Sequence, residues 1–291
     1  MNSLDEALPP CPACGELKPF EERFFRQGFA ILECHGCGLG KTAIDADFDP
    51  QSYYTKDYFD GTYSDGYFDY KSSESVLRIE FSKTLQKIKK KTGIVSGHLL
   101  EVGCAYGFFL EEAQKYFDVH GVEIAVDAVT ACHERGLHSV RQGEADESTL
   151  THLGSFDLVV MLDVIEHLAQ PHEVLARLAR RINPGGALIL TTGDFQSVAA
   201  RVMGPRWRLL TPPQHLWFFS PISIRKMAEK SGLEFIHLSH PAKLVPFSLI
   251  LFQFLRMLRM RLPTLPPIFS RLGVPVNLFD AMFVVLRKPA S

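Results

Sequence analysis

The sequence predicts an α/β fold in which a seven-stranded sheet with helices on both faces follows a small cysteine-rich domain. Short apolar runs alternate with helical segments from His98 onward, a pattern typical of a parallel-rich sheet. Four of the six cysteines lie in the first 45 residues, where helical periodicity is weak. The chain has 291 residues, of which 46% are hydrophobic, so it is long enough for one large and one small domain.

Composition argues against some partners and compartments. Lys and Arg number 31 and Asp and Glu number 33, so the net charge of −2 does not attract nucleic acid as a strongly basic domain would. The N-terminus has neither the basic start nor the apolar run of a secretory signal, so we expect a cytoplasmic protein with reduced thiols. The longest apolar run, 245–255, is interrupted by Gln253 and is shorter than the roughly 18 residues that span a bilayer.

The cysteine-rich domain, assigned to residues 1–48, has the spacing of a zinc ribbon. Two C-x-x-C pairs, each followed by a glycine, stand 19 residues apart. The four candidate ligands are Cys11, Cys14, Cys34 and Cys37. Four thiolates make a closed tetrahedral site, so the zinc is expected to be structural and not catalytic. Redox-active cysteine pairs and a chance pattern are the alternatives.

The second domain is assigned to residues 72–291. It follows a stretch rich in Tyr, Phe, Asp and Gly, residues 49–71, which we interpret as a linker or lid. Apolar positions recur at helical spacing between lysines over 72–91, which predicts an amphipathic helix. Seven candidate strands come next, with the sequences HLLEV, FDVHGVEI, HSVRQ, FDLVVMLD, GALILTT, LEFIHLS and AMFVVLRK.

The turn after the first of these strands carries the sharpest local pattern. LLEV leads through Gly103 and Gly107 into a helix, and glycine lets the backbone turn tightly and approach a ligand. A dinucleotide site needs G-x-G-x-x-G, but Ala105 and Phe108 stand where its second and third glycines belong, so a nicotinamide-dependent oxidoreductase is not expected. The second strand ends at Glu123, which suits hydrogen bonding to both hydroxyls of an adenosine ribose. A surface glutamate at a strand end is the simpler alternative.

With these residues, SFDLVVMLDVIEHLAQP and INPGGALIL, the chain resembles the class I S-adenosylmethionine-dependent methyltransferases that have a ubiquinone-biosynthesis-like catalytic domain. The resemblance covers about residues 72–240 and the last strand, and it implies a Rossmann-like sheet and S-adenosylmethionine as cofactor. Ala105 departs from the family, which usually has a middle glycine there. The residues expected at the cofactor are Glu101, Gly103, Cys104, Gly107, Glu123, Ile124, Glu144, Ala145, Asp146 and Asp163. Whether Glu144 or Asp146 reaches the adenine amino group is left open.

The candidate catalytic residues are His167 and His215. Asp163, Glu166 and His167 follow the fourth strand, at the edge where open α/β sheets bind ligands. The pKa of histidine is near neutrality, so His167 suits removal of a proton from an acceptor hydroxyl. The resemblance places His215 in a segment that covers the active site. Alternatively, Glu166 and His167 cap or brace the following helix, and His215 satisfies local backbone groups.

A metal at the Glu166–His167 pair is not favoured. Some enzymes that resemble this chain and share the pair bind a divalent cation with it. Two ligands are fewer than such a site needs.

Residues 240–278 form an insertion before the last strand. Gln253, Arg256 and Arg259 recur every third residue and give an apolar helix a narrow polar stripe. Such a stripe fits peripheral membrane contact through residues 245–262. A hydrophobic lid or dimer contact is the alternative that we favour.

The function predicted from these patterns is methyl transfer to a small-molecule acceptor. The expected acceptor atom is a hydroxyl of a sugar, a glycan, or a natural-product intermediate such as a polyketide or a quinone-like compound. An RNA or other nucleic-acid methyltransferase is the second hypothesis. The near-neutral charge weakens it, as does the absence of an Asn/Asp-Pro-Pro-Tyr/Phe motif, since residues 162–165 read LDVI. A non-catalytic scaffold that binds the cofactor is the third hypothesis.

Overall fold

The computed structural model describes residues 9–17, 19–44, 73–248, 250–251, 255 and 271–290. The linker 49–71 and most of the segment 245–262 lie outside these residues. The chain divides into two compact units. Unit 1 consists of Met1–Gln51, Ala145–His240 and Phe279–Ser291, and unit 2 consists of Ser52–Glu144 and Pro241–Leu278.

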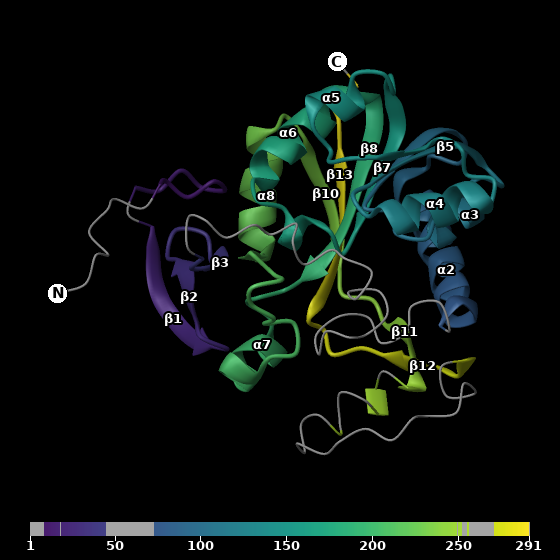
Figure 1. Cartoon of the computed structure of the whole chain (residues 1–291). Coiled ribbons are helices and arrows are strands. Elements are labelled where there is room, and N and C mark those ends of the chain that lie inside the picture. The colour runs from purple at the N-terminus through teal and green to yellow at the C-terminus, as the bar shows by residue number, and fades with distance from the viewer. Residues whose placement is uncertain are drawn as a thin grey trace. The chain divides into compact units, whose positions relative to one another are not determined.

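The N-terminal strands of unit 1 form a small antiparallel sheet (Figure 1). Its members, in the order in which they pair, are β1 (Phe20–Arg26), β2 (Phe29–Cys34), β3 (Gly40–Thr42) and β9 (Trp217–Phe218). Gln27 and Gly28 join β1 to β2 with φ values of 53° and 88°, as a two-residue hairpin turn of the primed type requires. The fourth strand, β9, comes from a segment far along the chain and was not predicted.

Unit 1 also contributes four strands to the large sheet: β7 (Phe156–Leu162), β8 (Ile182–Gly193), β10 (Glu234–Ser239) and β13 (Ala281–Arg287). β7 and β8 are parallel, whereas β13 runs antiparallel to both β8 and β10. β8 and β10 therefore point the same way, and their carboxyl ends meet one edge. The apolar residues of β13 and β8 are almost all fully buried, which explains their continuous hydrophobic sequences.

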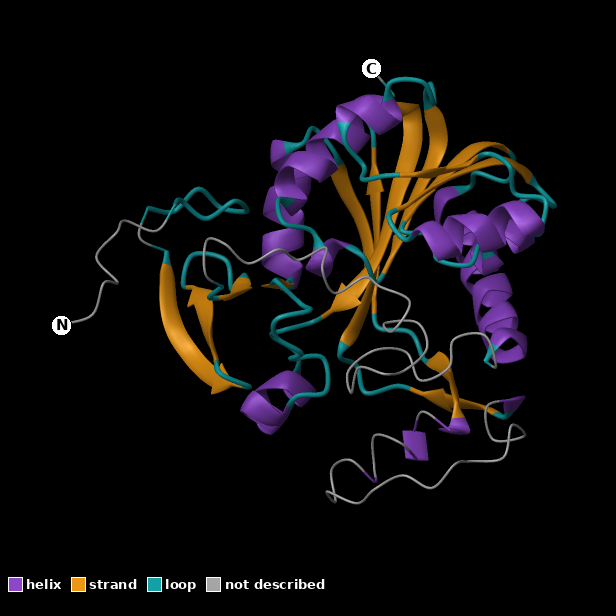
Figure 2. Cartoon of the chain, viewed as in Figure 1, coloured by secondary structure: helices purple, strands orange, loops and turns teal. Residues whose placement is uncertain are grey.

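The helices of unit 1 follow their capping signals. α6 (Pro171–Arg181) and α8 (Pro221–Lys230) both begin with proline at the first turn, and Ser220 with Ser223 forms a capping box at α8. Figure 2 shows these two helices beside the strands of this unit. The shorter elements are α5 (Glu147–Leu150), η2 (Ile165–His167), α7 (Val198–Met203) and η3 (Gly204–Arg206).

The first described element of unit 2 is α2 (Glu74–Thr92), which ends at Gly93 in the left-handed conformation and confirms the predicted amphipathic helix. Three parallel strands follow: β4 (Gly97–Val102), β5 (Phe117–Glu123) and β6 (Val140–Gln142). Between them lie α3 (Phe108–Ala113) and α4 (Val126–Glu134). From the predicted insertion, β11 (Lys243–Pro246) and β12 (Gly273–Val276) pair as a two-stranded antiparallel sheet.

The strands of the large sheet follow the order β10-β13-β8-β7-β4-β5-β6. They are the seven strands predicted from the sequence, so the prediction of a seven-stranded Rossmann-like α/β fold is confirmed. β8 starts at Ile182, earlier than its apolar sequence suggested, because Ile182 already pairs with Phe156 of β7; the Pro-Gly-Gly stretch, with Gly185 at a φ of 79°, shifts the register before pairing resumes between Leu158 and Ala187. Among the described residues, none of the helices is long and apolar enough to cross a membrane.

Candidate active site

The glycine turn of unit 2 connects β4 to α3. Gly103 has a φ of 72° and Gly107, the N-cap of α3, a φ of 76°, and both values favour glycine. A Cβ on Gly107 would lie 2.5 Å from Leu137 Cδ1 and 3.0 Å from Cys132 Sγ, so a side chain there meets a packed wall. Ala105, which replaces the family's middle glycine, adopts a φ of 46°. The turn thus keeps the glycine-like backbone at a position where the sequence has lost the glycine.

Glu123 ends β5 with a buried carboxylate that supports this turn. Its Oε2 accepts a hydrogen bond from the Ala105 N–H at 2.8 Å, and its Oε1 accepts one from the Ala125 N–H at 2.9 Å. Burial raises the pKa of Glu123, and these backbone N–H groups oppose the rise. The side chain is only 5% exposed, which argues against the alternative of a surface glutamate. Glu123 therefore links the glycine turn to the loop that starts α4.

Glu101 lies one strand away in β4 and is also buried. Its Oε2 makes no hydrogen bond to any described residue. Burial, followed by the charges of Cys132 and Glu123, raises its pKa well above the ordinary value. A buried carboxyl group without a partner is suited to a ligand that brings a positive charge.

Replacing Glu101 with glutamine is expected to stabilise the cofactor-free protein more at pH 8 than at pH 4, by at least about 1 kcal/mol. The pKa of Glu101 is raised in the folded state, so the wild type loses stability as pH rises above the unfolded-state pKa. Glutamine mimics the protonated acid and has no such dependence. Urea unfolding at both pH values measures the difference. Glu134→Gln on the exposed face of α4 is the control, and an equal effect of both substitutions would contradict the explanation.

The remaining cofactor candidates differ in their surroundings. Cys104 is buried, and Ile124 is half-buried next to Glu123. Glu144 is exposed, whereas Ala145 is buried. Asp146 is the N-cap of α5 and accepts the Thr149 N–H at 2.8 Å, so this carboxylate already has a structural role.

Asp163 follows β7 in unit 1 and has an unusual backbone. Its φ is 56°, a value that costs energy for a residue with a side chain. Thr191 of β8 holds it there: the threonine Oγ1 donates to Asp163 Oδ1 at 2.8 Å and accepts the Asp163 N–H at 3.0 Å. Asp163 therefore lies at the carboxyl edge of the sheet, in a fixed orientation.

His167 and His215 lie together in unit 1, with ring centroids 4.7 Å apart and planes at 79°. His167 Nδ1 donates to the Gln214 carbonyl at 3.0 Å, and His215 Nδ1 donates to the Leu209 carbonyl at 2.8 Å. Both bonds place the ring proton on Nδ1 and the lone pair on Nε2. Gln170 occupies the N-cap of α6 without a side-chain cap, so neither Glu166 nor His167 caps that helix.

The two imidazoles differ in basicity. Burial lowers the pKa of His167, while its bond to Gln214 and the charge of Asp163 oppose the shift. Burial, and then the neighbouring His167, lower the pKa of His215 to about 3. Both shifts favour the neutral form of the rings at pH 7.

Glu166 lies close to both histidines, which the sequence alone could not show. One potential ligand atom from each of Glu166, His167 and His215 lies within 4.8 Å of the other two. Two imidazoles oriented by backbone carbonyls and a buried carboxylate are a donor set that suits a divalent cation. The structure therefore brings a third potential ligand, His215, to the two that were visible in the sequence.

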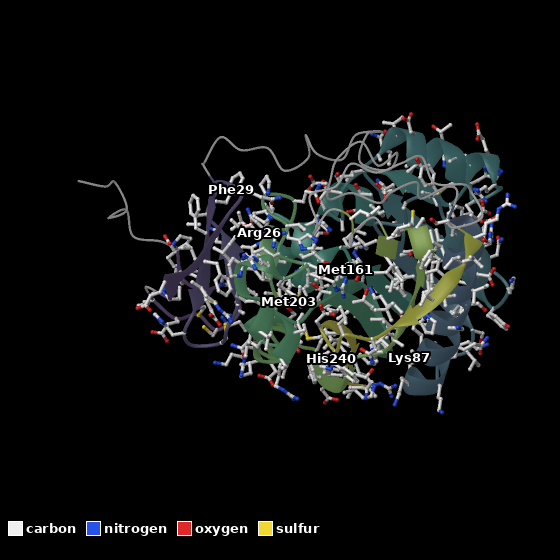
Figure 3. All side chains as sticks on the ribbon, turned by 90° about the horizontal axis from the view of Figure 1, so that it is seen from below. Arg26, Phe29, Lys87, Met161, Met203 and His240 are labelled. Carbon is white, nitrogen blue, oxygen red and sulfur yellow. The ribbon has the colours of Figure 1, made fainter. Side chains whose placement is uncertain are left out.

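Sequence reasoning missed Asp194 and His240. Asp194 follows β8 and is 4% exposed, and its Oδ2 accepts a hydrogen bond from His240 Nε2 at 2.9 Å. His240, labelled in Figure 3, follows β10, so both residues lie at the carboxyl edge of the strands of unit 1. Position was the one signal in the sequence that could have identified Asp194. It directly follows β8, as Asp163 directly follows β7.

The four N-terminal cysteines converge. Cys11 Sγ lies 3.6 Å from Cys37 Sγ, and Cys14 Sγ lies 3.5 Å from Cys34 Sγ. All four sulfur atoms are within 4.8 Å of one another. Zn–S bonds of about 2.3 Å give a tetrahedron with edges of about 3.8 Å, so the cluster fits a zinc ribbon. The hydrogen bond between Cys11 and Cys37 lowers the pKa of Cys11 to about 5 and raises the pKa of Cys37, so these two thiols share a proton.

The fold has a glycine turn after β4 and a buried glutamate at the end of β5. Together these features define an S-adenosylmethionine-dependent methyltransferase. Residues 76–238, more than half of the chain, match the family described as "Methyltransferase domain". The chain belongs to this family.

Curated relatives agree with this class. The ubiquinone biosynthesis O-methyltransferase of Hydrogenovibrio crunogenus is 27% identical over 169 residues, which cover 54% of this chain and 68% of the relative. The enzyme of the same name from Caulobacter sp. is 31% identical over 139 residues, covering 44% and 55%.

Solved structures share the fold at low sequence identity. Magnesium protoporphyrin IX methyltransferase from Synechocystis PCC 6803 with bound S-adenosylhomocysteine (SAH) has a TM-score of 0.51 and 16% identity, covering 81% of this chain and 97% of that one. A methyltransferase structure from Bacillus halodurans C-125 has a TM-score of 0.51 and 17% identity, covering 71% and 99%.

Proposed function

We propose that the enzyme transfers a methyl group from S-adenosylmethionine to a hydroxyl of a small molecule, with His167 as the base. The observation that carries this proposal is the His167–His215 pair, whose Nδ1 atoms are both bonded to backbone carbonyls. That arrangement directs a neutral Nε2 of His167 to accept a proton. His215, whose pKa is lowered to about 3, stays neutral at pH 7.

Methyl transfer requires few catalytic groups from the protein. The bound sulfonium supplies an activated methyl group for in-line displacement by the acceptor oxygen. His167 Nε2 takes the hydroxyl proton as the new C–O bond forms, which contributes a rate factor of about 10² to 10⁴ when a base is needed. Glu123 would hold the ribose hydroxyls, and Glu101 would face the cationic methionine end. Their burial supports both roles, because charge interactions are strong where water is excluded.

The names of the relatives favour one class of acceptor. Several relatives are named ubiquinone biosynthesis O-methyltransferases, which supports oxygen as the acceptor atom. Of the acceptors considered from sequence, a quinone-like intermediate with a phenolic hydroxyl is therefore preferred over a sugar or glycan. A phenol is also more acidic than a sugar hydroxyl, so a base with a lowered pKa can deprotonate it.

We also propose that Cys11, Cys14, Cys34 and Cys37 hold a structural zinc ion. The sulfur separations support this, as do the turns of the two knuckles, where Gly15 donates to the Cys11 carbonyl at 2.8 Å and Gly38 to the Cys34 carbonyl at 2.7 Å. All four ligand positions come from the protein, so no position is left for a substrate.

Replacing His167 with alanine is expected to lower turnover by about 10² to 10⁴ while SAH affinity, measured by calorimetry, changes less than about threefold. Zinc-loaded protein is incubated with S-adenosylmethionine and a panel of catechols, phenols and nucleotide sugars, and methylated product is detected by mass spectrometry. His152→Ala, an exposed histidine of the same unit, is the control. Undiminished turnover in His167→Ala would remove the proposed base.

The donor set of Glu166, His167 and His215 supports a second role, the binding of a divalent cation that orients the acceptor hydroxyl. Omitting Mg²⁺ and Mn²⁺ from protein that retains its ribbon zinc separates the two roles. Base catalysis predicts turnover without added cation, whereas the second role predicts its loss and a cation-binding signal in calorimetry that His215→Ala removes.

A further inference from the structure

The backbone of residues 214–218 is bonded on one side to the ribbon strand β3. Thr42, which is completely buried, donates from Oγ1 to the His215 carbonyl at 2.6 Å and from its N–H to the Leu216 carbonyl at 2.9 Å. Beyond these bonds β3 pairs antiparallel with β9, with Gly40 opposite Phe218. The ribbon therefore continues directly into the segment that carries His215.

The same backbone is bonded on its other side to the turn η2. The Leu216 N–H donates to the Glu166 carbonyl at 2.9 Å, and the Gln214 carbonyl accepts from the His167 ring at 3.0 Å. Three consecutive residues thus connect β3 to the turn that carries His167. The positions of both imidazoles depend on this short stretch of backbone.

β3 packs closely against β9 and its neighbours. A Cβ on Gly40 would lie 2.7 Å from Phe195 Cε1 and 2.9 Å from Phe218 Cβ, so only glycine permits the approach of β3. At the other end, the buried Ser220 Oγ donates to the carbonyl of Cys37 at 2.6 Å. The ribbon therefore contacts this segment at two places, at Gly40 and at Cys37, and Cys37 belongs to the cysteine cluster.

We propose that the ribbon holds the His167–His215 pair in place and that Thr42 is the positioning residue, an inference that rests on the function proposed above. The threonine hydroxyl fixes the carbonyl of His215, and with it the peptide plane from which the imidazole extends. The ribbon thereby affects the chemical step and leaves cofactor binding unchanged. Thr42 touches neither cofactor nor acceptor in this role.

Thr42→Val keeps the shape and the backbone bond of Thr42 but removes its hydroxyl, and Thr42→Ser restores the hydroxyl. We expect kcat to fall about tenfold in the valine variant, with KM for S-adenosylmethionine unchanged within about twofold, because small displacements of catalytic groups act on the chemical step. The serine variant is expected to retain at least half of the wild-type kcat. Hydrogen exchange measured by mass spectrometry provides a readout that needs no acceptor. Peptides covering 164–168 and 211–218 should exchange several-fold faster in the valine variant and at the wild-type rate in the serine variant.

Ile31→Val is the matched control, because Ile31 is completely buried in the ribbon but has no bond to residue 215. Equal losses of kcat in Ile31→Val and Thr42→Val would overturn the proposal, as would unchanged exchange in the valine variant. If valine prevents folding, Thr42→Ala takes its place with the same expectations. A wild type without turnover on any acceptor would count against the proposed function alone, since the exchange comparison still tests the positioning role.

Discussion

Replacing Glu123 with alanine is expected to lower the affinity for SAH at least a hundredfold. The carboxylate organises the glycine turn through the N–H groups of Ala105 and Ala125. Hydrogen bonds to a charged acceptor are each worth about 1.5–3 kcal/mol, and a factor of ten in affinity is 1.4 kcal/mol. Losing two of them at the turn therefore accounts for the expected effect, before any direct contact with the ribose is counted. Isothermal titration calorimetry measures it.

Two further variants separate binding from folding. Asp127→Ala removes an exposed acid at the start of α4, close in sequence, and should bind SAH like the wild type. Glu123→Gln keeps one carbonyl acceptor for two N–H donors, so its affinity should be intermediate. A folded Glu123→Ala protein that binds SAH within fivefold of the wild type would contradict the assignment of Glu123 to the cofactor.

The centre of the large sheet was predictable because the burial of its strands is recorded in their own sequences. β7 and β8 are covered on both faces and are nearly continuous runs of apolar residues. The start of α8 was predictable for a similar reason, since Ser220 and Pro221 are local capping signals. The cysteine cluster also follows from spacing, because C-x-x-C pairs bring ligands to one ion only in a few turn geometries.

The histidine pair could not be derived in this way. His167 and His215 were chosen separately, and nothing in their spacing along the chain indicates that their rings touch. Their contact depends on β9, a strand of two residues that is too short to leave a period in the sequence. It depends equally on β3, which has three residues and is also too short to show a periodic sequence pattern. Long-range pairing of such short strands is set by the packing around them.

Asp194 and His240 illustrate a related limit. Each follows a predicted strand, but the sequence does not say which strands are neighbours. The antiparallel β13 separates β8 from β10, and the bond from His240 to Asp194 joins the ends of these two strands. Strand order therefore decides which edge residues meet, and strand order was not part of the prediction.

Replacing Cys34 with serine is expected to remove the zinc ion and unfold the ribbon. Apparent binding free energies of structural zinc, about 10–16 kcal/mol, are comparable to the whole stability of a domain, which is about 5–15 kcal/mol. Three short strands and a hairpin turn bury too little surface to replace that contribution. Metal analysis of the purified protein should show one zinc per chain for the wild type and none for the variant.

The consequence extends beyond the ribbon, because β2 packs against later segments of unit 1. Ile31 packs in one buried cluster with Phe195, Trp207 and Phe218. Unfolding of the ribbon exposes these side chains, so the thermal midpoint of the variant should fall by several degrees, since about 1 kcal/mol corresponds to roughly 2–4 °C in a chain of this size. His35→Ala is the matched control, because His35 lies in the same knuckle and its half-exposed side chain faces Glu21 at 3.6 Å on the surface, while its backbone bond to Pro19 is kept in the variant. Full zinc content in Cys34→Ser, or an equal thermal shift in His35→Ala, would mean that the four cysteines do not hold the ribbon together through a metal.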